Sequence, residues 1–194
     1  MPTSRLVVVL IALATAGCMT VPARYRQPER VYQPAVERVG VKGLSSTEYE
    51  AVDGRFLNDE SAMKWLLEDT RCARQVGPSN GDGVHVEVES VGTRHYGVGR
   101  TMVRLVEACT IIGPLVGLPF PGAADGEATA RLYRDGSFVK QLKTTSRVGY
   151  WTPIYTYMRA DRKGIGAARW MALRDLADQV AADVCGARRV ATAR

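Results

Sequence analysis

The chain has 194 residues, of which 46% are hydrophobic and 24% are charged, as in an ordinary globular protein. These proportions exclude disorder, collagen and coiled coil as descriptions of the whole chain. Four cysteines are too few for a disulfide scaffold, and two histidines leave little material for a zinc site or a histidine-based triad. The net charge of +6 is a modest excess, and no nucleic-acid-binding motif accompanies it.

The first eighteen residues have the layout of a secretory signal peptide. A short positive start, residues 1–5, is followed by an apolar core, residues 6–13, and by small residues at 14–17 that lead into Cys18. The apolar core is too short to span a bilayer as a permanent helix. We therefore expect residues 1–17 to be removed from the mature protein.

The residues around the expected cleavage site are more specific. Ala16-Gly17-Cys18 resembles the lipobox of bacterial lipoproteins, although Thr15 stands where leucine is most common. The resemblance implies lipid attachment at Cys18, with chains that hold the protein on a membrane because each buried methylene contributes about 0.8 kcal/mol. Met19, in place of the aspartate typical of inner-membrane retention, implies the outer membrane and its periplasmic face. The alternative is an ordinary signal peptide with Cys18 as a plain thiol.

The mature chain is predicted to have three parts. Residues 18–35 contain three prolines and form an extended tether, residues 36–186 form one domain, and residues 187–194 form a basic tail. The tether carries Arg24, Arg26 and Arg30, and the chain's end carries Arg188, Arg189 and Arg194. We favour solvated segments over contact with anionic headgroups, which would contribute up to about 1 kcal/mol per arginine.

The first half of the domain is predicted to contain two strands and a helix. Residues 36–44 alternate weakly and indicate a strand. Asn58 can cap a helix over residues 59–76, which has acids in its first turn and which Gly77-Pro78 would stop. Residues 84–89 alternate valine with polar side chains and give the clearest strand of the chain.

The second half is predicted to contain a hairpin and a long helix. Residues 125–134 alternate, Asp135-Gly136 is a strong hairpin signal, and residues 138–148 form the partner strand. Apolar residues recur at helical spacing over residues 165–185. The sum is an α+β fold, with a sheet of three to five mostly antiparallel strands and two helices on one face.

Residues 108–124 contain no charge but include three prolines and three glycines, which indicates an apolar loop rather than a membrane-spanning helix. Its six large apolar side chains would gain roughly 9–18 kcal/mol on leaving water. These side chains are Ile111, Ile112, Leu115, Val116, Leu118 and Phe120. Such a loop is expected to find an apolar environment.

Residues 150–158 include Trp151, Tyr155 and Tyr157, ring types that favour partner interfaces and bilayer headgroup levels. The apolar loop enters the predicted hairpin and the aromatic segment leaves it, so both must lie at the edge opposite Asp135-Gly136. The predicted contact residues with membrane or partner are Ile111, Ile112, Leu115, Leu118, Phe120, Trp151, Tyr155 and Tyr157. The alternative is that the loop caps the domain and the aromatics close its core.

A search for catalytic, metal or cofactor sites returns none. His85 is predicted on the outer face of a strand beside Glu87 and Glu89, where a histidine is usually ordinary soluble surface. The second histidine, His95, lies in a glycine-rich stretch, and residues 97–101 lack the spacing and lysine of a phosphate loop.

Three thiols remain once Cys18 is lipidated. Cys72 and Cys185 follow the two predicted helices and can form a disulfide if the sheet has the simplest order, whereas an extra strand at residues 100–107 would separate them. Cys109 is interpreted as a small buried hydrophobe.

The order of tether, helix, strand, apolar loop, hairpin and final helix is similar to that of several poorly characterised Gram-negative lipoproteins. This resemblance implies a non-enzymatic envelope lipoprotein, an accessory or assembly module whose partners are the membrane and an envelope protein. A small-molecule or lipid-binding module is the alternative, and a hydrolase is less favoured. No nucleic-acid partner is expected, and the sequence indicates no oligomeric state.

Overall fold

The computed structural model describes Tyr32 and residues 36–50, 56–79, 83–95, 119–153 and 157–185. For residues 94–95, 119–121, 151–153 and 157–161 the description is of the backbone.

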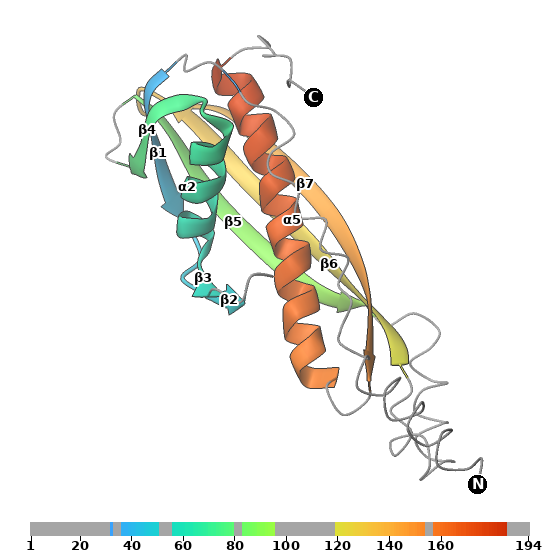
Figure 1. The fold of residues 1–194 in the computed structure, drawn as a ribbon. Coiled ribbons are helices and arrows are strands. Elements are labelled where there is room, and N and C mark those ends of the chain that lie inside the picture. Colours follow the sequence, from blue (N-terminus) through green and yellow to red (C-terminus); the bar gives the residue numbers. More distant parts are fainter. Residues whose placement is uncertain are drawn as a thin grey trace, which may run out of the picture.

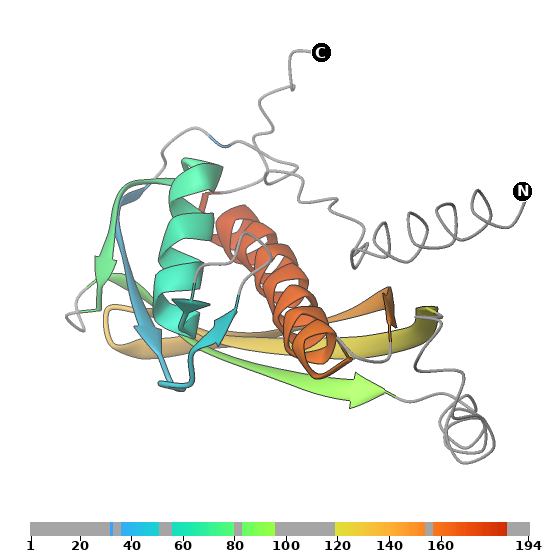
Figure 2. The same cartoon turned by 60° about the horizontal axis from the view of Figure 1, so that its bottom comes forward.

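The predicted α+β fold is confirmed. A five-stranded sheet has the order β4-β1-β5-β6-β7, and a small second sheet pairs β2 with β3 (Figure 1). The helices are α2 (Asp59–Thr70) and α5 (Tyr157–Cys185), and both lie on one face of the large sheet (Figure 2). The strands are β1 (Val36–Gly43), β2 (Tyr49–Glu50), β3 (Phe56–Leu57), β4 (Ala73–Pro78), β5 (Val84–His95), β6 (Pro119–Arg134) and β7 (Ser137–Pro153).

The large sheet is mixed, where we expected mostly antiparallel pairing. β1 runs parallel to both of its neighbours, β4 and β5, whereas β5, β6 and β7 pair antiparallel. The parallel β1–β4 pair arises because α2 serves as the crossover between these two strands, a connection that parallel strands require.

The first helix is shorter than the predicted 59–76. It ends at Thr70 because Arg71 adopts a left-handed conformation, with φ of 55°, and its N–H bonds the Glu68 carbonyl. The next residues form β4 and pair with β1, with Ala73 opposite Val36 and Val76 opposite Val39. Sheet hydrogen bonds therefore override the helical pattern that continues to Val76.

The predicted start of this helix is confirmed. The Asn58 side chain accepts a hydrogen bond from the Ser61 N–H at 2.9 Å, and the Ser61 hydroxyl lies 3.2 Å from the Asn58 N–H that it accepts. This reciprocal capping box satisfies two N–H groups that the helix itself leaves unpaired.

The predicted hairpin is also confirmed. Asp135 and Gly136 both have positive φ, 50° and 76°, as a two-residue turn of the twist-matched type requires. The strands are longer than predicted, because β6 begins at Pro119 and β7 ends at Pro153. Residues 119–124, expected to belong to an apolar loop, are therefore strand residues that pair with β7.

The last helix begins at Tyr157, eight residues before the expected position 165. Gly164 and Gly166 disfavour helix in isolation. In the fold, however, a Cβ at Gly164 would collide with the Tyr150 ring, and one at Gly166 would collide with the Glu50 carbonyl oxygen. Both glycines are thus used for close packing, and tertiary contacts extend the helix toward its N-terminus.

The core lies between the two helices and the inner face of the sheet. Val84, Val86 and Val88 all point into it, as their alternation predicted. The inner face of β7 also carries hydroxyls, which donate to carbonyls of α5: Thr144 to Ala172 at 2.7 Å and Ser146 to Ala168 at 2.5 Å. These bonds fix the long helix to the edge strand of the sheet.

The helix approaches the sheet most closely at Gly126. A Cβ there would overlap the backbone of Ala168, so we expect Gly126→Ala to displace α5 and to cost about 1–3 kcal/mol of unfolding free energy. Gly149→Ala is the matched control on the partner strand, since no atom lies within 4 Å of its added Cβ. Urea unfolding of both variants checks this; equal midpoints would contradict the close approach.

Candidate interaction surface

Strands β6 and β7 extend past the rest of the sheet. The last residue of β5, His95, pairs with Ala123, whereas β6 and β7 remain paired to Pro119 and Pro153. Residues 119–122 and 150–153 therefore form a two-stranded ribbon that projects four residues, about 13 Å, beyond β5. The start of α5 lies at the same end of the molecule (Figure 1). We call the ribbon and the first turns of α5 the ribbon end.

A two-stranded ribbon is marginally stable alone, and this one is supported by a single buried ring. Tyr150, only 2% exposed, packs between Gly122 of the ribbon and Gly164 of α5. A Cβ on either glycine would collide with that ring. The ribbon and the start of the helix are thus held together by packing that depends on two glycines.

The ribbon end gathers several of the predicted contact positions. Phe120 pairs with Thr152, and Trp151 pairs with Pro121, while Tyr157 is the first residue of α5. The prediction that the two segments meet opposite Asp135-Gly136 is confirmed for these backbone positions.

Other predicted site residues fall outside the described residues. They are Cys18, Ile111, Ile112, Leu115, Leu118 and Tyr155. By covalent connection, the segment 96–118 joins the ribbon end between His95 and Pro119, and the segment 154–156 joins it between Pro153 and Tyr157. The chain therefore brings both segments to this end of the fold.

Part of the alternative interpretation also holds. Tyr150 and Ala124, from the aromatic and apolar segments, belong to a small core cluster with Val148, Ala167 and Ala168. The inner side of the ribbon's base is therefore a packed core, and only the parts of the two segments beyond it remain as a contact surface.

The opposite end of the molecule holds both limits of the described chain. Tyr32 is buried, and its N–H donates to the Thr70 carbonyl at 2.9 Å. Nearby, Cys72 and Cys185 form a disulfide with their Cα atoms 5.7 Å apart. This is the pairing that the sequence allowed, and it places the start of β4 beside the end of α5. We call this region the disulfide end.

A buried ion pair lies in the middle of the fold, and sequence reasoning missed it. Asp59 accepts hydrogen bonds from the Ser90 N–H at 2.8 Å and from Arg169 Nη2 at 3.2 Å. The Arg169 guanidinium also stacks over the Tyr49 ring, 4.2 Å from its centroid. The pair side chains are 8% and 0% exposed. Asp59 had been interpreted only as a helix-dipole residue, and nothing local in the sequence marks Arg169 as its partner.

The histidine-containing strand face is solvated, with side chains engaged with one another. His85 stacks on Tyr133 at 4.6 Å between ring centroids. Glu87 accepts from Lys42 at 3.1 Å and from the Tyr133 hydroxyl at 3.2 Å. Partial burial raises the pKa of Glu87, but these two hydrogen bonds outweigh burial and hold it below its ordinary value. His95 lies ten residues along β5, about 33 Å away, so the two histidines share no site.

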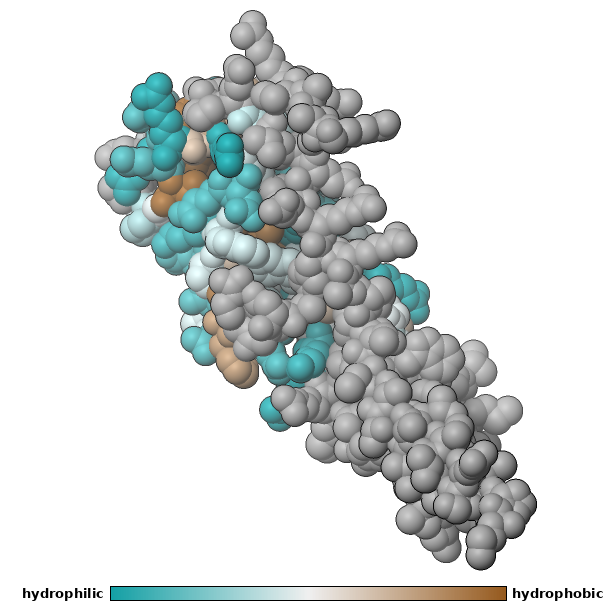
Figure 3. All heavy atoms as spheres, viewed as in Figure 1, coloured by the Kyte–Doolittle hydropathy of each residue, from teal (hydrophilic) through white to brown (hydrophobic). Residues whose placement is uncertain are grey.

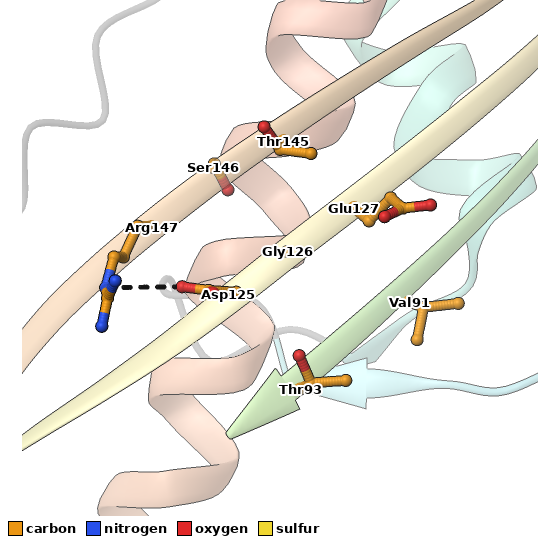
Figure 4. Close-up of a pocket in the computed structure, with 8 residues that line it drawn as sticks. All are labelled: Val91, Thr93, Asp125, Gly126, Glu127, Thr145, Ser146 and Arg147. Atoms are coloured by element: carbon orange, nitrogen blue, oxygen red, sulfur yellow. Dashed lines mark ion pairs between the residues drawn. The ribbon is translucent and has the colours of Figure 1, made fainter. Parts of the chain in front are cut away.

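The open face also carries a hollow of about 560 Å³ near the ribbon end (Figure 4). Its lining comes from three strands and comprises Val91, Thr93, Asp125, Gly126, Glu127, Thr145, Ser146 and Arg147. Asp125 lies 3.6 Å from Arg147, and Glu127 lies 2.7 Å from Lys143. Because both carboxylates already have cationic partners, the hollow is a solvated ion-pair surface rather than the apolar pocket expected of a lipid-binding module.

The remaining surface is ordinary. In the described part of the chain no cluster of three or more metal-ligating side chains occurs, and no helix there has the length and apolar character to cross a bilayer. Hydrophobic areas on the helical side are small and separated by hydrophilic ones (Figure 3), as scattered exposed apolar side chains usually are.

Comparisons with known proteins give likeness in structure only. No protein-family model and no curated protein matches the chain. A solved structure of uncharacterized lipoprotein B from Nitrosomonas europaea is 11% identical, with a TM-score of 0.47, covering 83% of this chain and 90% of that one. A minor lipoprotein from Acinetobacter baumannii is 13% identical, with a TM-score of 0.44, covering 79% and 95%. A candidate lipoprotein from Caulobacter crescentus is 15% identical, with a TM-score of 0.42, covering 75% and 91%. The proposals below rest on the chain's own residues.

Proposed function

We propose that the protein is a lipid-anchored envelope lipoprotein without enzymatic activity, which contacts the membrane or an envelope protein through its ribbon end. The signal-peptide layout and the lipobox-like run before Cys18 support the anchor, and Met19 supports the outer membrane and its periplasmic face.

The observation that carries the contact surface is the projecting ribbon. Residues 119–122 and 150–153 pair only with each other among the described strands. They carry Phe120 and Trp151, and they join the uncharged segment that contains Leu115 and Leu118. An edge extended away from the body of a sheet, with rigid packing behind it, is suited to contact and contributes little to the main core.

The proposal is tested by photo-crosslinking in intact cells. A photoreactive phenylalanine analogue replaces Tyr155, three residues or fewer from both the ribbon and α5, and replaces Phe138 in the control. Phe138 is 57% exposed and adjoins the hairpin turn at the other end of β7. We expect adducts from position 155 and none from position 138, because only the ribbon end is a contact surface.

The anchor is tested in the same cells. Cys18→Ala should abolish incorporation of labelled palmitate and sedimentation with membranes, whereas Cys109→Ala should change neither. Adducts of equal yield from positions 138 and 155 would refute the assigned surface. Lipid labelling that persists in Cys18→Ala would refute the anchor.

A further inference from the structure

The two ends of the molecule are far apart, and the tether starts from only one of them. Tyr32 is fixed at the disulfide end, where its N–H bonds Thr70 and its hydroxyl lies 3.5 Å from the Asp178 carbonyl that it donates to. β7 runs from Ser137, near that end, to Pro153 on the ribbon, which is sixteen residue steps or about 53 Å. Register places Tyr32 no closer to the ribbon, since Val39 aligns with Val84, and Val84 with Arg134.

The tether is too short to cover this distance comfortably. Fourteen residues separate Cys18 from Tyr32. A flexible chain of that length spans about 20 Å on average, and a fully extended polyproline-like chain spans about 43 Å. For the ribbon end to touch the leaflet that holds Cys18, the tether would have to run back along the whole molecule at full extension. That arrangement removes nearly all of the tether's conformational freedom.

We infer that the ribbon end faces away from the anchoring leaflet and docks on an envelope protein. This inference rests on the proposed function, because it requires both the lipid at Cys18 and a contact surface at the ribbon end. The disulfide end then lies toward the membrane, and the ribbon, with its aromatic residues, is presented to a partner located farther from that leaflet.

Charge indicates the chemistry of the partner. α5 opens at the ribbon end with Arg159, Arg162 and Lys163 against a single acid, Asp161, and its first turn holds no acid. Lys163 is engaged with Glu50 at 3.5 Å, but Arg162 is exposed. Cations at the start of a helix oppose its dipole, so they contribute nothing to the helix itself. Arginine and aromatic residues are enriched in protein interfaces, and here they fit an apolar patch with acidic groups around it.

Orientation is measured on the lipidated protein in vesicles of phosphatidylethanolamine and phosphatidylglycerol that contain a headgroup-quenching lipid. In a Cys109→Ala background, a fluorophore is attached to Gly149→Cys, near the ribbon, or to Ala23→Cys, five residues from the anchor. Gly149 has open space around it, so the label fits. We expect the Ala23→Cys label to be quenched several-fold more than the Gly149→Cys label. Equal quenching would show that the leaflet itself is the docking surface and would overturn the inference.

Partner chemistry is tested in cells with the crosslinker at position 155. Arg162→Glu should lower the yield of protein adducts several-fold, whereas Arg134→Glu, an exposed arginine at the opposite end of β6, should leave it unchanged. Adducts on lipid alone, or a protein adduct indifferent to Arg162→Glu, would overturn the inference and leave the contact surface standing. Absence of any adduct at position 155 would instead remove the proposed function.

Discussion

Replacing Arg169 with methionine should lower the free energy of unfolding by about 3–5 kcal/mol, because it leaves the Asp59 carboxylate buried without its counter-charge. That is a large share of the 5–15 kcal/mol typical of a whole domain. The loss is expected to be global, since the pair joins the start of α2 to α5, and Ser90 adds a link to β5. Urea unfolding followed by circular dichroism measures it.

Two further variants separate charge burial from lost packing. Asp59→Asn combined with Arg169→Met should be more stable than Arg169→Met alone, because the amide oxygen still accepts from the Ser90 N–H and no charge stays buried. Lys143→Met breaks the exposed pair with Glu127, whose side chains are 58% and 50% exposed, and should cost at most about 1 kcal/mol. If Lys143→Met proved as costly as Arg169→Met, the buried pair would have no special role.

Loss of the disulfide should have the second large effect. Cys72 and Cys185 close a loop with a sequence separation of 113, and a cross-link of this span restricts the unfolded chain strongly. We expect Cys72→Ala combined with Cys185→Ala to lose about 2–5 kcal/mol of unfolding free energy. The bond also holds the short edge strand β4 to the end of α5, so proteolysis should begin near this end in the double variant.

Reduction supplies the control. A reductant should lower the urea midpoint of the unaltered protein to that of the double variant, and it should leave the double variant unchanged. Mass spectrometry without reductant should find the unaltered protein lighter by two hydrogen atoms than after reduction. An urea midpoint indifferent to reductant would mean that the bond contributes nothing to stability.

Local signals in the sequence predicted the elements whose geometry is local. Asp135-Gly136 predicted the hairpin turn because these residue types tolerate positive φ, and both have it. Asn58 predicted the start of α2 because its side chain replaces a missing backbone acceptor. The alternation of Val84, Val86 and Val88 predicted the buried face of β5.

The errors occurred where distant contacts decide the structure. Residues 73–78 continue a helical pattern, yet they form β4 because β1 offers a parallel partner. Gly164 and Gly166 disfavour helix, yet α5 includes them because Tyr150 and the Glu50 carbonyl need the space that a side chain would fill. Propensities of about 1 kcal/mol per residue lose to such packing.

The sequence by itself determined the expected address of the protein, the hairpin turn, the helix cap, and the meeting of the apolar and aromatic segments at one edge. Each follows from covalent connection or from residues a few positions apart. Only the tertiary structure decided the mixed sheet, the Asp59–Arg169 pair, the joining of Cys72 to Cys185, and the projection of the ribbon past β5. These depend on residues up to 113 positions apart, whose approach is set by how the helices pack on the sheet.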